Sequence, residues 1–193
     1  MKLFIKPGAC SLSPHIVLEE LGLKYEVEKV DTKAKKTESG ADYLTINPNG
    51  YVPALQLDSG AVLTEGPAIV QYLADLQPEK KLAPANGTPE RYQLQSWLTF
   101  TGMELHRSFT PLFNPAASQD WKEAARANLE RRLAWLNGEL AGRDYLMGKD
   151  FTVANWSKFV KFDISGLPHL TAYMARVAAR PAVLAALKAE GLA

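Results

Sequence analysis

The chain has 193 residues, of which 47% are hydrophobic, so it can bury a sizeable core and is unlike a disordered protein. Its 22 basic and 21 acidic residues give a formal charge of +1, which excludes recruitment of nucleic acid or an anionic membrane by the overall charge. Cys10 is the one cysteine, which excludes an intramolecular disulfide and a thiolate-rich structural zinc site.

The first part of the chain has the pattern of a small α/β domain. A short β-prone run, Lys2–Lys6, is closed by Pro7-Gly8, and an apolar helical pattern then begins at Ser13-Pro14 and ends at Gly22. A second strand at Tyr25–Val30 completes a βαβ unit, which is the usual connection between parallel strands.

A polar loop and a hairpin follow. Asp31–Gly50 is polar and ends in turn residues, and residues 52–57 and 61–64 read as two short strands around a tight turn. A helix begins near Pro67, because proline suits the first helical turn. Residues 77–89 are rich in Pro, Gly, Asn and Lys and lack an apolar face, which is typical of a linker.

The remainder has apolar residues at helical spacing, in Glu90–Phe109, Gln119–Leu140 and Leu170–Leu187. Arg176 and Arg180 are four residues apart in the last of these, which predicts a solvated face. We therefore predict an α/β plus all-α protein. Its domains are residues 1–77, a linker at 78–89, and a helical bundle at 90–193.

The start of the chain lacks the basic region, long apolar stretch and cleavage site of a signal peptide. No apolar run approaches the roughly 20 residues of a membrane helix. We predict a soluble, cytoplasmic protein, which also fits a lone thiol in a reducing compartment.

Cys10 lies just after the first strand and just before the first helix. The N–H groups and dipole of a helix N-terminus lower a thiol pKa, so this is a position for a working thiol. A cysteine buried as a small apolar residue is the alternative, and is more common for cysteines in general.

Three other places carry weaker signals. Pro53 opens a strand, and a cis Val52-Pro53 bond there would let the Val52 backbone pair with an extended peptide, although a trans proline is the more frequent case. Glu65 lies at a helix start, where it and free N–H groups could hold a zwitterion or could simply complement the dipole. His106 lies on a long helix, where a histidine is more often packed or solvated than catalytic. The three histidines have no metal-ligand spacing, so we expect no metal site.

Taken together, these segments resemble the glutathione transferases, most closely the bacterial beta class, over nearly the whole chain. The matching segments are Lys2–Phe4, Pro7–His15, Asn47–Leu55, Leu63–Ile69, Glu104–His106, Arg180-Pro181 and Ala189–Leu192.

The resemblance implies a thioredoxin-like first domain (βαβ-ββα), a cis Val52-Pro53 bond and a homodimer. It implies glutathione as co-substrate, without another cofactor, and a small hydrophobic electrophile as second substrate. Cys10 and His106 would lie at the glutathione sulfur. The glutathione-binding residues it implies are Lys35 at the glycyl end, Val52 and Pro53 at the cysteinyl part, Glu65 and Gly66 at the γ-glutamyl end, and Thr99, Met103 and Glu104 reaching the neighbouring subunit's ligand.

The chain departs from the family pattern in two places. Thr99 stands where the beta-class pattern has Asn, which predicts a shorter or lost polar contact. After Phe151–Ala154 the family continues with an Asp that completes a capping box with Thr152, and then with a buried helix, whereas this chain has Asn155 and lacks about two helical turns. Removing a core helix should cost more free energy than the marginal stability of a small protein allows. We therefore favour the interpretation that a segment is omitted from the sequence over the interpretation that the protein is shortened.

Three functions are open at this point. Conjugation of glutathione to electrophiles, in detoxification and including loss of halide from aromatic compounds, is the leading hypothesis. Thiol-disulfide exchange or peroxide reduction through Cys10 is the rival within enzymes. A binding protein that keeps the fold without catalysis is the third, because fold does not determine activity.

Overall fold

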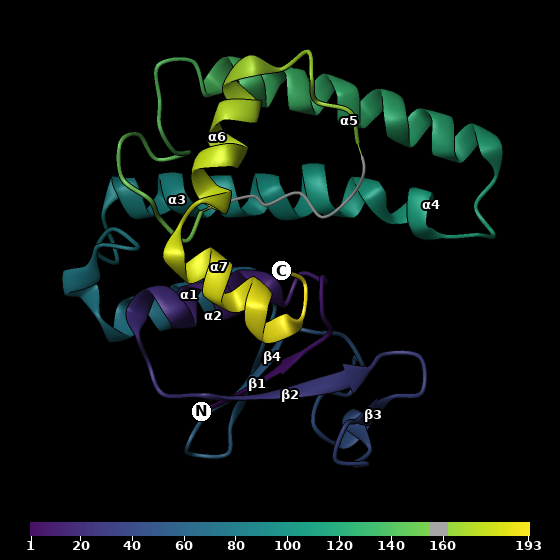
Figure 1. Ribbon diagram of the computed structural model, residues 1–193, viewed down its shortest axis with the longest axis vertical. Helices are drawn as coiled ribbons and strands as arrows, with labels where there is room; N and C mark the ends of the chain where they lie inside the picture. The colour runs from purple at the N-terminus through teal and green to yellow at the C-terminus, as the bar shows by residue number, and fades with distance from the viewer. Residues whose placement is uncertain (155–161) are drawn as a thin grey trace. The chain divides into compact units, whose positions relative to one another are not determined.

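The computed structural model describes residues 1–154 and 162–193 and divides into two compact units (Figure 1). The first unit comprises residues 1–83 and 178–193, and the second comprises residues 84–177. The last helix thus groups with the N-terminal part of the chain, and the domain boundaries at 77 and 90 stay a prediction.

The first unit contains a mixed β-sheet, three α-helices and two short 3₁₀ turns. In chain order they are β1 (Lys2–Ile5), α1 (Leu12–Leu21), β2 (Glu26–Asp31), β3 (Lys36–Thr37), η1 (Tyr43–Thr45), β4 (Ala54–Gln56), β5 (Val62–Thr64), α2 (Gly66–Leu76), η2 (Pro78–Lys80) and α7 (Pro181–Glu190). The expected βαβ-ββα order is confirmed, and the short strand β3 is an addition within the region predicted as a loop.

The sheet has the strand order β3-β2-β1-β4-β5. β1 pairs with β2 in parallel, as the βαβ unit predicts, and with β4 in antiparallel orientation. Phe4, Ala54 and Thr64 lie opposite one another in the β1-β4-β5 register. The residues after β1, before β4 and after β5 therefore leave the sheet at the same end, which is where the candidate site lies.

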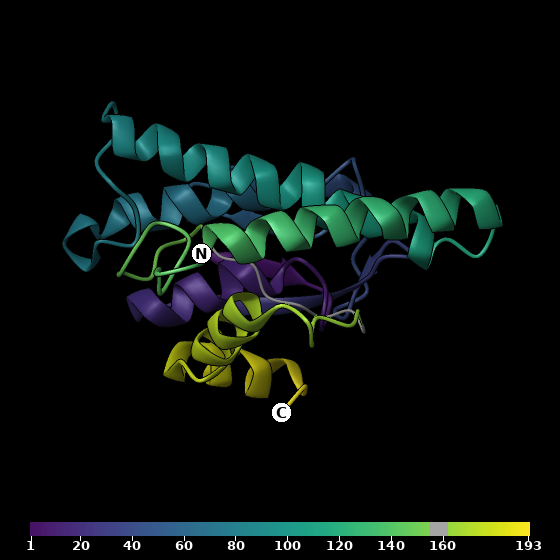
Figure 2. The same cartoon turned by 90° about the horizontal axis from the view of Figure 1, so that it is seen from above.

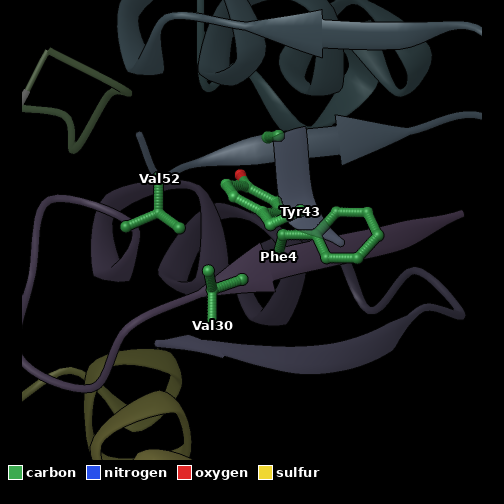
Figure 3. Close-up of a cluster of buried hydrophobic side chains, with 5 residues drawn as sticks. Phe4, Val30, Tyr43 and Val52 are labelled. Atoms are coloured by element: carbon green, nitrogen blue, oxygen red, sulfur yellow. The ribbon is translucent and has the colours of Figure 1, made fainter. Parts of the chain in front are cut away.

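Both faces of the sheet are covered. Figure 1 shows α1, α2 and α7 on one side of it. On β1, side chains alternate between the faces, so Phe4 points away from Leu3 and Ile5. Phe4 packs on Tyr43 of the following loop region, with ring centroids 5.6 Å apart, and Val30 and Val52 complete this cluster (Figure 3). The cluster fixes the segment that leads into the Val52-Pro53 bond.

In its described residues, the second unit contains a long helical rod and two further helices. In chain order the elements are α3 (Pro89–Phe100), a π-helical segment η3 (Thr101–His106), η4 (Arg107–Phe109), α4 (Thr110–Phe113), α5 (Gln119–Glu139) and α6 (Pro168–Ala178). Thr88 caps α3 by accepting a hydrogen bond from Arg91 N–H, and Ser118 does the same for α5 through Trp121 N–H. The expected helix Glu90–Phe109 is therefore present, but its last part is π-helical and 3₁₀.

The rod from α3 to α4 runs antiparallel to α5 (Figure 2). As the residue numbers of the contacts increase along the rod, the residue numbers of their partners on α5 decrease. Phe100 packs on Trp135 with centroids 4.7 Å apart, Glu104 Oε2 lies 2.7 Å from Arg132 Nε, and Asn128 donates a hydrogen bond to Ser108 at 3.0 Å. At the other end of α5, Asn137 Oδ1 accepts from His169 N–H and Leu170 N–H, which caps α6.

The predicted single helix Leu170–Leu187 is wrong. Arg180 is extended, with φ −68° and ψ 136°, and Pro181 begins α7 as a separate helix. The physical reason is that proline disfavours helical geometry in the residue before it. The expectation of a missing segment after Ala154 concerns Asn155 and its successors, which lie outside the described residues.

Among the helices of residues 1–154 and 162–193, no single helix has both the length and the apolar composition to cross a membrane. α6 and α7 meet that requirement only when they are counted together across the break between them.

Candidate functional site

Cys10 lies in the turn between β1 and α1, and the structure holds this turn from both sides. Ser11 is fully buried, and its hydroxyl accepts from Lys6 N–H at 3.1 Å and donates to Lys6 O at 3.2 Å. The Cys10 thiol donates to Val52 O, with a sulfur–oxygen distance of 3.1 Å. Cys10 is an exposed residue, and this hydrogen bond sets the direction of its thiol.

The expected lowering of the Cys10 pKa is wrong. Neighbouring atoms desolvate the thiol, and this raises the pKa of Cys10 above its ordinary value. The N–H groups of Cys10 and Ser11 act in the opposite direction, as a helix start does, while the Glu65 carboxylate raises the pKa further. Cys10 is therefore a neutral hydrogen-bond donor at neutral pH.

The Val52-Pro53 peptide bond is cis, as the resemblance implies. The loop before it is anchored at Tyr51 O, which accepts hydrogen bonds from the Tyr43 hydroxyl and from the Asn47 side-chain amide, each at 2.8 Å. Val52 itself is buried, at 9% exposure, and its carbonyl takes the Cys10 thiol. The loop thus presents the Val52 backbone to Cys10 from a fixed position.

Lys35 lies at the far end of the same loop. Its Nζ donates to Gly50 O at 2.8 Å and lies 5.5 Å from the centroid of the Tyr51 ring. Gly50 has φ +65°, which favours glycine, and a Cβ there would lie 2.8 Å from Lys35 Nζ and would displace the lysine side chain. Lys35 is a half-buried cation, and the two residues that hold it lie one and two positions before Val52 in the loop.

Glu65 and Gly66 form the turn between β5 and α2. Glu65 has φ +65°, a conformation that costs a non-glycine residue on the order of 1 kcal/mol or more and that clusters at functional sites. The Glu65 carbonyl accepts hydrogen bonds from Ala68 N–H and Ile69 N–H, and Pro67 has no N–H. In the first turn of α2, Gly66 N–H is therefore the backbone donor that these bonds do not use. A Cβ on Gly66 would lie 3.8 Å from Pro53, so this turn adjoins the Val52-Pro53 bond.

Cys10, Val52, Pro53, Glu65 and Gly66 therefore lie together at one end of the sheet. A thiol donor, a backbone segment, a carboxylate and a helix-start N–H surround one place, with the Lys35 ammonium along the loop. This arrangement suits an extended peptide that carries a thiol in the middle and charged groups at its ends.

The remaining predicted residues belong to the second unit, on and beside the π-helical segment. Such segments are rare and are frequent at functional sites. Thr99 donates its hydroxyl to Gln95 O at 2.8 Å, Met103 is 54% exposed, and Glu104 pairs with Arg132. Desolvation lowers the pKa of the His106 imidazole below its ordinary value, which favours the neutral form at neutral pH.

The sequence did not identify two residues that hold the Cys10 turn in place. His15 and Glu190 are buried and joined by a contact of 2.8 Å between Nδ1 and Oε1, and Glu190 Oε2 accepts from Gly8 N–H at 3.0 Å. The C-terminal helix α7 thereby holds the turn that carries Cys10. The signal was His15 itself, because a polar residue inside the apolar run of α1 needs a buried partner.

The predicted solvated face of Arg176 and Arg180 is also wrong. Arg180 makes a two-bond contact with Glu20 on α1, at 2.6 and 2.9 Å, and Arg176 donates to Asp144 O at 2.6 Å. Arg180 therefore fastens the start of α7 to α1, as Glu190 fastens its end.

Two family models match the chain. The pattern described as "Glutathione S-transferase, N-terminal domain" matches residues 8–76, and "Glutathione S-transferase, C-terminal domain" matches residues 100–181. Glutathione S-transferase GstA of Escherichia coli O157:H7 is 46% identical over 201 aligned positions that cover the whole of both chains.

Two solved structures of similar chains match over the full length of this chain and of their own. A sphingomonad glutathione S-transferase complexed with glutathione is 53% identical, with a TM-score of 0.94. A bacterial beta class glutathione S-transferase from Sphingomonas chungbukensis is 50% identical, also with a TM-score of 0.94.

Sequence, fold and site geometry lead to one conclusion. The chain belongs to the glutathione S-transferase family of enzymes, with close structural similarity to its bacterial beta class.

Proposed function

We propose that this enzyme binds glutathione in its first unit and conjugates the glutathione sulfur to small hydrophobic electrophiles, in detoxification. The observation that carries the proposal is the meeting of the Cys10 thiol, the Val52 backbone and the Glu65-Gly66 turn at one end of the sheet. The glutathione complex of the sphingomonad relative supports the choice of ligand.

Each part of glutathione has a matching group. The cysteinyl part pairs with the Val52 backbone as an added strand would, and the Lys35 ammonium binds the glycyl carboxylate. At the γ-glutamyl end, Gly66 N–H donates to the carboxylate and Glu65 accepts from the ammonium group. The Lys35 ammonium and the Cys10 thiol donate to the backbone carbonyls of Gly50 and Val52, so the loop directs both donors.

Conjugation requires the glutathione sulfur as a thiolate. The neutral Cys10 thiol donates a hydrogen bond to that sulfur in place of Val52 O, which stabilises its negative charge. The glutathione thiol proton passes to the neutral imidazole of His106 or to water. The sulfur then attacks the electrophilic carbon, a C–S bond forms, and with an aryl halide the halide leaves with the electrons of its bond to carbon.

The second substrate meets aromatic side chains of the second unit. Phe113 and Trp121 are 65% and 50% exposed, so they offer apolar surface to an electrophile. Phe109 is buried and packs on Phe113 and Phe162. Its contribution is to hold Phe113 rather than to touch the substrate.

The raised pKa of Cys10 favours conjugation over thiol-disulfide exchange. Exchange uses Cys10 as the attacking thiolate, and desolvation together with the Glu65 charge reduces that form. A mixed disulfide with oxidised glutathione is still expected under oxidising conditions, because Cys10 is an exposed residue.

Two further features complete the proposal. The enzyme acts as a homodimer, and the exposed Met103 with its neighbours Thr99 and Glu104 reaches the neighbouring subunit's glutathione. It acts in the cytoplasm, where its thiol stays reduced.

The experiment combines turnover with intact mass. Wild-type protein, Cys10→Ala and Cys10→Ser are assayed with glutathione and an activated aryl halide, and are weighed after exposure to oxidised glutathione. We expect Cys10→Ala to keep turnover, reduced by about tenfold through loss of one hydrogen bond to a charged group, and Cys10→Ser to keep more because its hydroxyl still donates.

Two outcomes would contradict the proposal. Loss of turnover in both variants would make Cys10 the nucleophile and favour exchange. Glutathione binding without turnover on any of a panel of electrophiles would favour a non-catalytic binding protein.

A further inference from the structure

His106 ends the π-helical segment η3, and the short 3₁₀ segment η4 follows it directly. Arg107 N–H donates to Gly102 O, five residues back, whereas Thr110 N–H donates to Arg107 O, three residues back. An α-helix keeps a spacing of four throughout. The hydrogen-bond spacing of the backbone therefore changes from five to three across His106. Because the backbone sets the direction of each side chain, the direction of the imidazole depends on how this change is held.

Ser108 bridges the change in spacing. Its hydroxyl donates to Glu104 O at 2.8 Å, so one hydrogen bond joins the residue two positions before His106 to the residue two positions after it. A serine that bonds to the carbonyl four residues back often bends the helix that carries it. Both ends of this bond lie on the rod, so the bond sets the curvature of the backbone at His106.

Asn128 on α5 fixes the direction of that bond. Its Nδ2 donates to Ser108 Oγ at 3.0 Å, and its Oδ1 accepts from Arg131 Nη2 at 2.7 Å. An asparagine amide has its donors on one atom and its acceptor on the other, so the Arg131 cation decides which atom meets Ser108. A serine hydroxyl has a single hydrogen, and with Asn128 as its donor that hydrogen is available for Glu104 O. We call this chain of hydrogen bonds, from Arg131 through Asn128 and Ser108 to Glu104 O, the relay.

Core packing holds the same segment without setting its pitch. Leu105 is fully buried and Phe109 is 4% exposed, and their spacing of four places both on the inner face of the rod. Apolar contacts are non-directional, whereas a hydrogen bond is defined in distance and angle. The relay is therefore the element that specifies the direction of the backbone on either side of His106.

We propose that Ser108 and Asn128 are positioning residues, and that the relay directs the His106 imidazole toward the glutathione thiol. This role rests on the proposed function, in which His106 accepts the thiol proton. In that step the S–H bond breaks, an N–H bond forms on the imidazole, and the electron pair stays on sulfur. A general base works only within hydrogen-bond reach of the proton, and a displacement of about 1 Å can cost about 10²-fold in rate.

Four variants separate the relay from the rest of the helix pair. Ser108→Ala removes the hydroxyl, and Ser108→Thr keeps it, since a threonine in a helix can bond to the same carbonyl. Asn128→Asp keeps an acceptor for Arg131 but places an acceptor instead of a donor at Ser108, so the serine hydrogen turns to the new carboxylate. Glu130→Gln is the matched control, because it is an exposed change on α5 outside the relay.

The assay measures kcat and KM with glutathione and an activated aryl halide across the pH range, with the urea midpoint of each variant as a check on folding. We expect Ser108→Ala and Asn128→Asp to lower kcat by about tenfold, with the KM for glutathione within about twofold of the wild type. Ser108→Thr restores most of the kcat, and Glu130→Gln matches the wild type. In Ser108→Ala the decrease of kcat/KM at acid pH becomes shallower, because water takes a larger share of the proton.

A double-mutant cycle with His106→Gln shows whether the relay acts through the imidazole. We expect Ser108→Ala to have no further effect on kcat once His106 is replaced, because residues that act through one group are not additive. An equal loss of kcat with and without His106 would reveal a purely structural role and overturn the proposal. Wild-type kcat in Ser108→Ala, beside lost turnover in His106→Gln, would also overturn it and leave the proposed function standing. Full turnover in His106→Gln would instead remove His106 from the proposed function, and the positioning role with it.

Discussion

Glu190 couples the C-terminal helix to the turn that carries Cys10, and removing it tests whether that coupling matters. Glu190→Ala removes the carboxylate that contacts His15 Nδ1 and accepts from Gly8 N–H, so both of these nitrogen groups lose their partner. A buried polar group without a partner costs about 1 to 3 kcal/mol. His15 is fully buried and bears that cost in full, whereas Gly8 is partly exposed and bears less. We expect a loss of about 2 to 4 kcal/mol, from the 5 to 15 kcal/mol typical of a domain.

The assay is urea unfolding followed by circular dichroism, with the alkylation rate of Cys10 as the local readout. Glu190→Gln keeps an acceptor oxygen and should lose about half as much stability as Glu190→Ala. Lys188→Ala is the matched control, because it is an exposed change on the same helix and should cost less than about 0.5 kcal/mol. Cys10 alkylation should change in the Glu190 variants alone, since the turn loses its anchor. Equal stability of Glu190→Ala and Lys188→Ala would refute this account.

Three other changes test separate parts of the structure. Burial acts to raise the pKa of Glu28, but hydrogen bonds from Ser39, Thr37 and Lys2 outweigh it and hold that pKa at about 2, below the ordinary 4.5. This lowered pKa stabilises the folded protein above pH 4.5, and the stabilisation is lost as the pH falls toward 2. Glu28→Gln should therefore weaken the dependence of the urea midpoint on pH in this range, and an unchanged dependence would contradict the account. His106→Gln should lower kcat/KM by about 10²-fold or more if the imidazole accepts the proton. Because the neutral imidazole is favoured, kcat/KM of the wild type should decrease only when the pH falls below the ordinary histidine pKa. A decrease of kcat/KM already at neutral pH would show that the imidazolium is the active form. Gly50→Ala places a Cβ 2.8 Å from Lys35 Nζ, so calorimetry should show weaker glutathione binding than for Gly60→Ala, a positive-φ glycine with nothing within 4 Å, and equal affinities would remove Lys35 from the site.

Much of the fold follows from local sequence patterns. The continuous apolar run of Leu3, Phe4 and Ile5 indicates a strand buried on both faces, and the apolar spacing of α1 indicates a helix with a buried face; with the strand that follows they predict a βαβ unit. The break at Pro181 was readable from the same rules, since proline restricts Arg180, but helical periodicity continues through it and hides the boundary.

The partners of buried polar groups could not be predicted, because they are distant in sequence. Glu190 lies 175 residues from His15, and no periodicity links them. Arg180 is a second example of a partner that is distant in sequence. Its spacing from Arg176 indicates a solvated face, whereas in the folded protein it forms hydrogen bonds with Glu20.

The structure brings together five of the predicted site residues, Cys10, Val52, Pro53, Glu65 and Gly66, but the predicted direction of the Cys10 pKa shift is wrong. The position of Cys10 before a helix indicates a lowered pKa, and the N–H groups do act in that direction. Desolvation and the Glu65 carboxylate outweigh them, and both depend on how the Val52 loop and the β5–α2 turn close around the sulfur. Such a balance is set by tertiary structure and cannot be read from one segment.

The central claim is that the glutathione sulfur, and not Cys10, is the reacting thiolate. The most direct measurement is the thiolate absorbance that appears when glutathione binds to Cys10→Ser at neutral pH, because this variant keeps a hydroxyl donor and has no sulfur of its own at that position. Our account predicts a thiolate signal equal to the amount of glutathione bound. Binding without that signal, in a variant that has also lost turnover, would contradict it and return the nucleophile to Cys10.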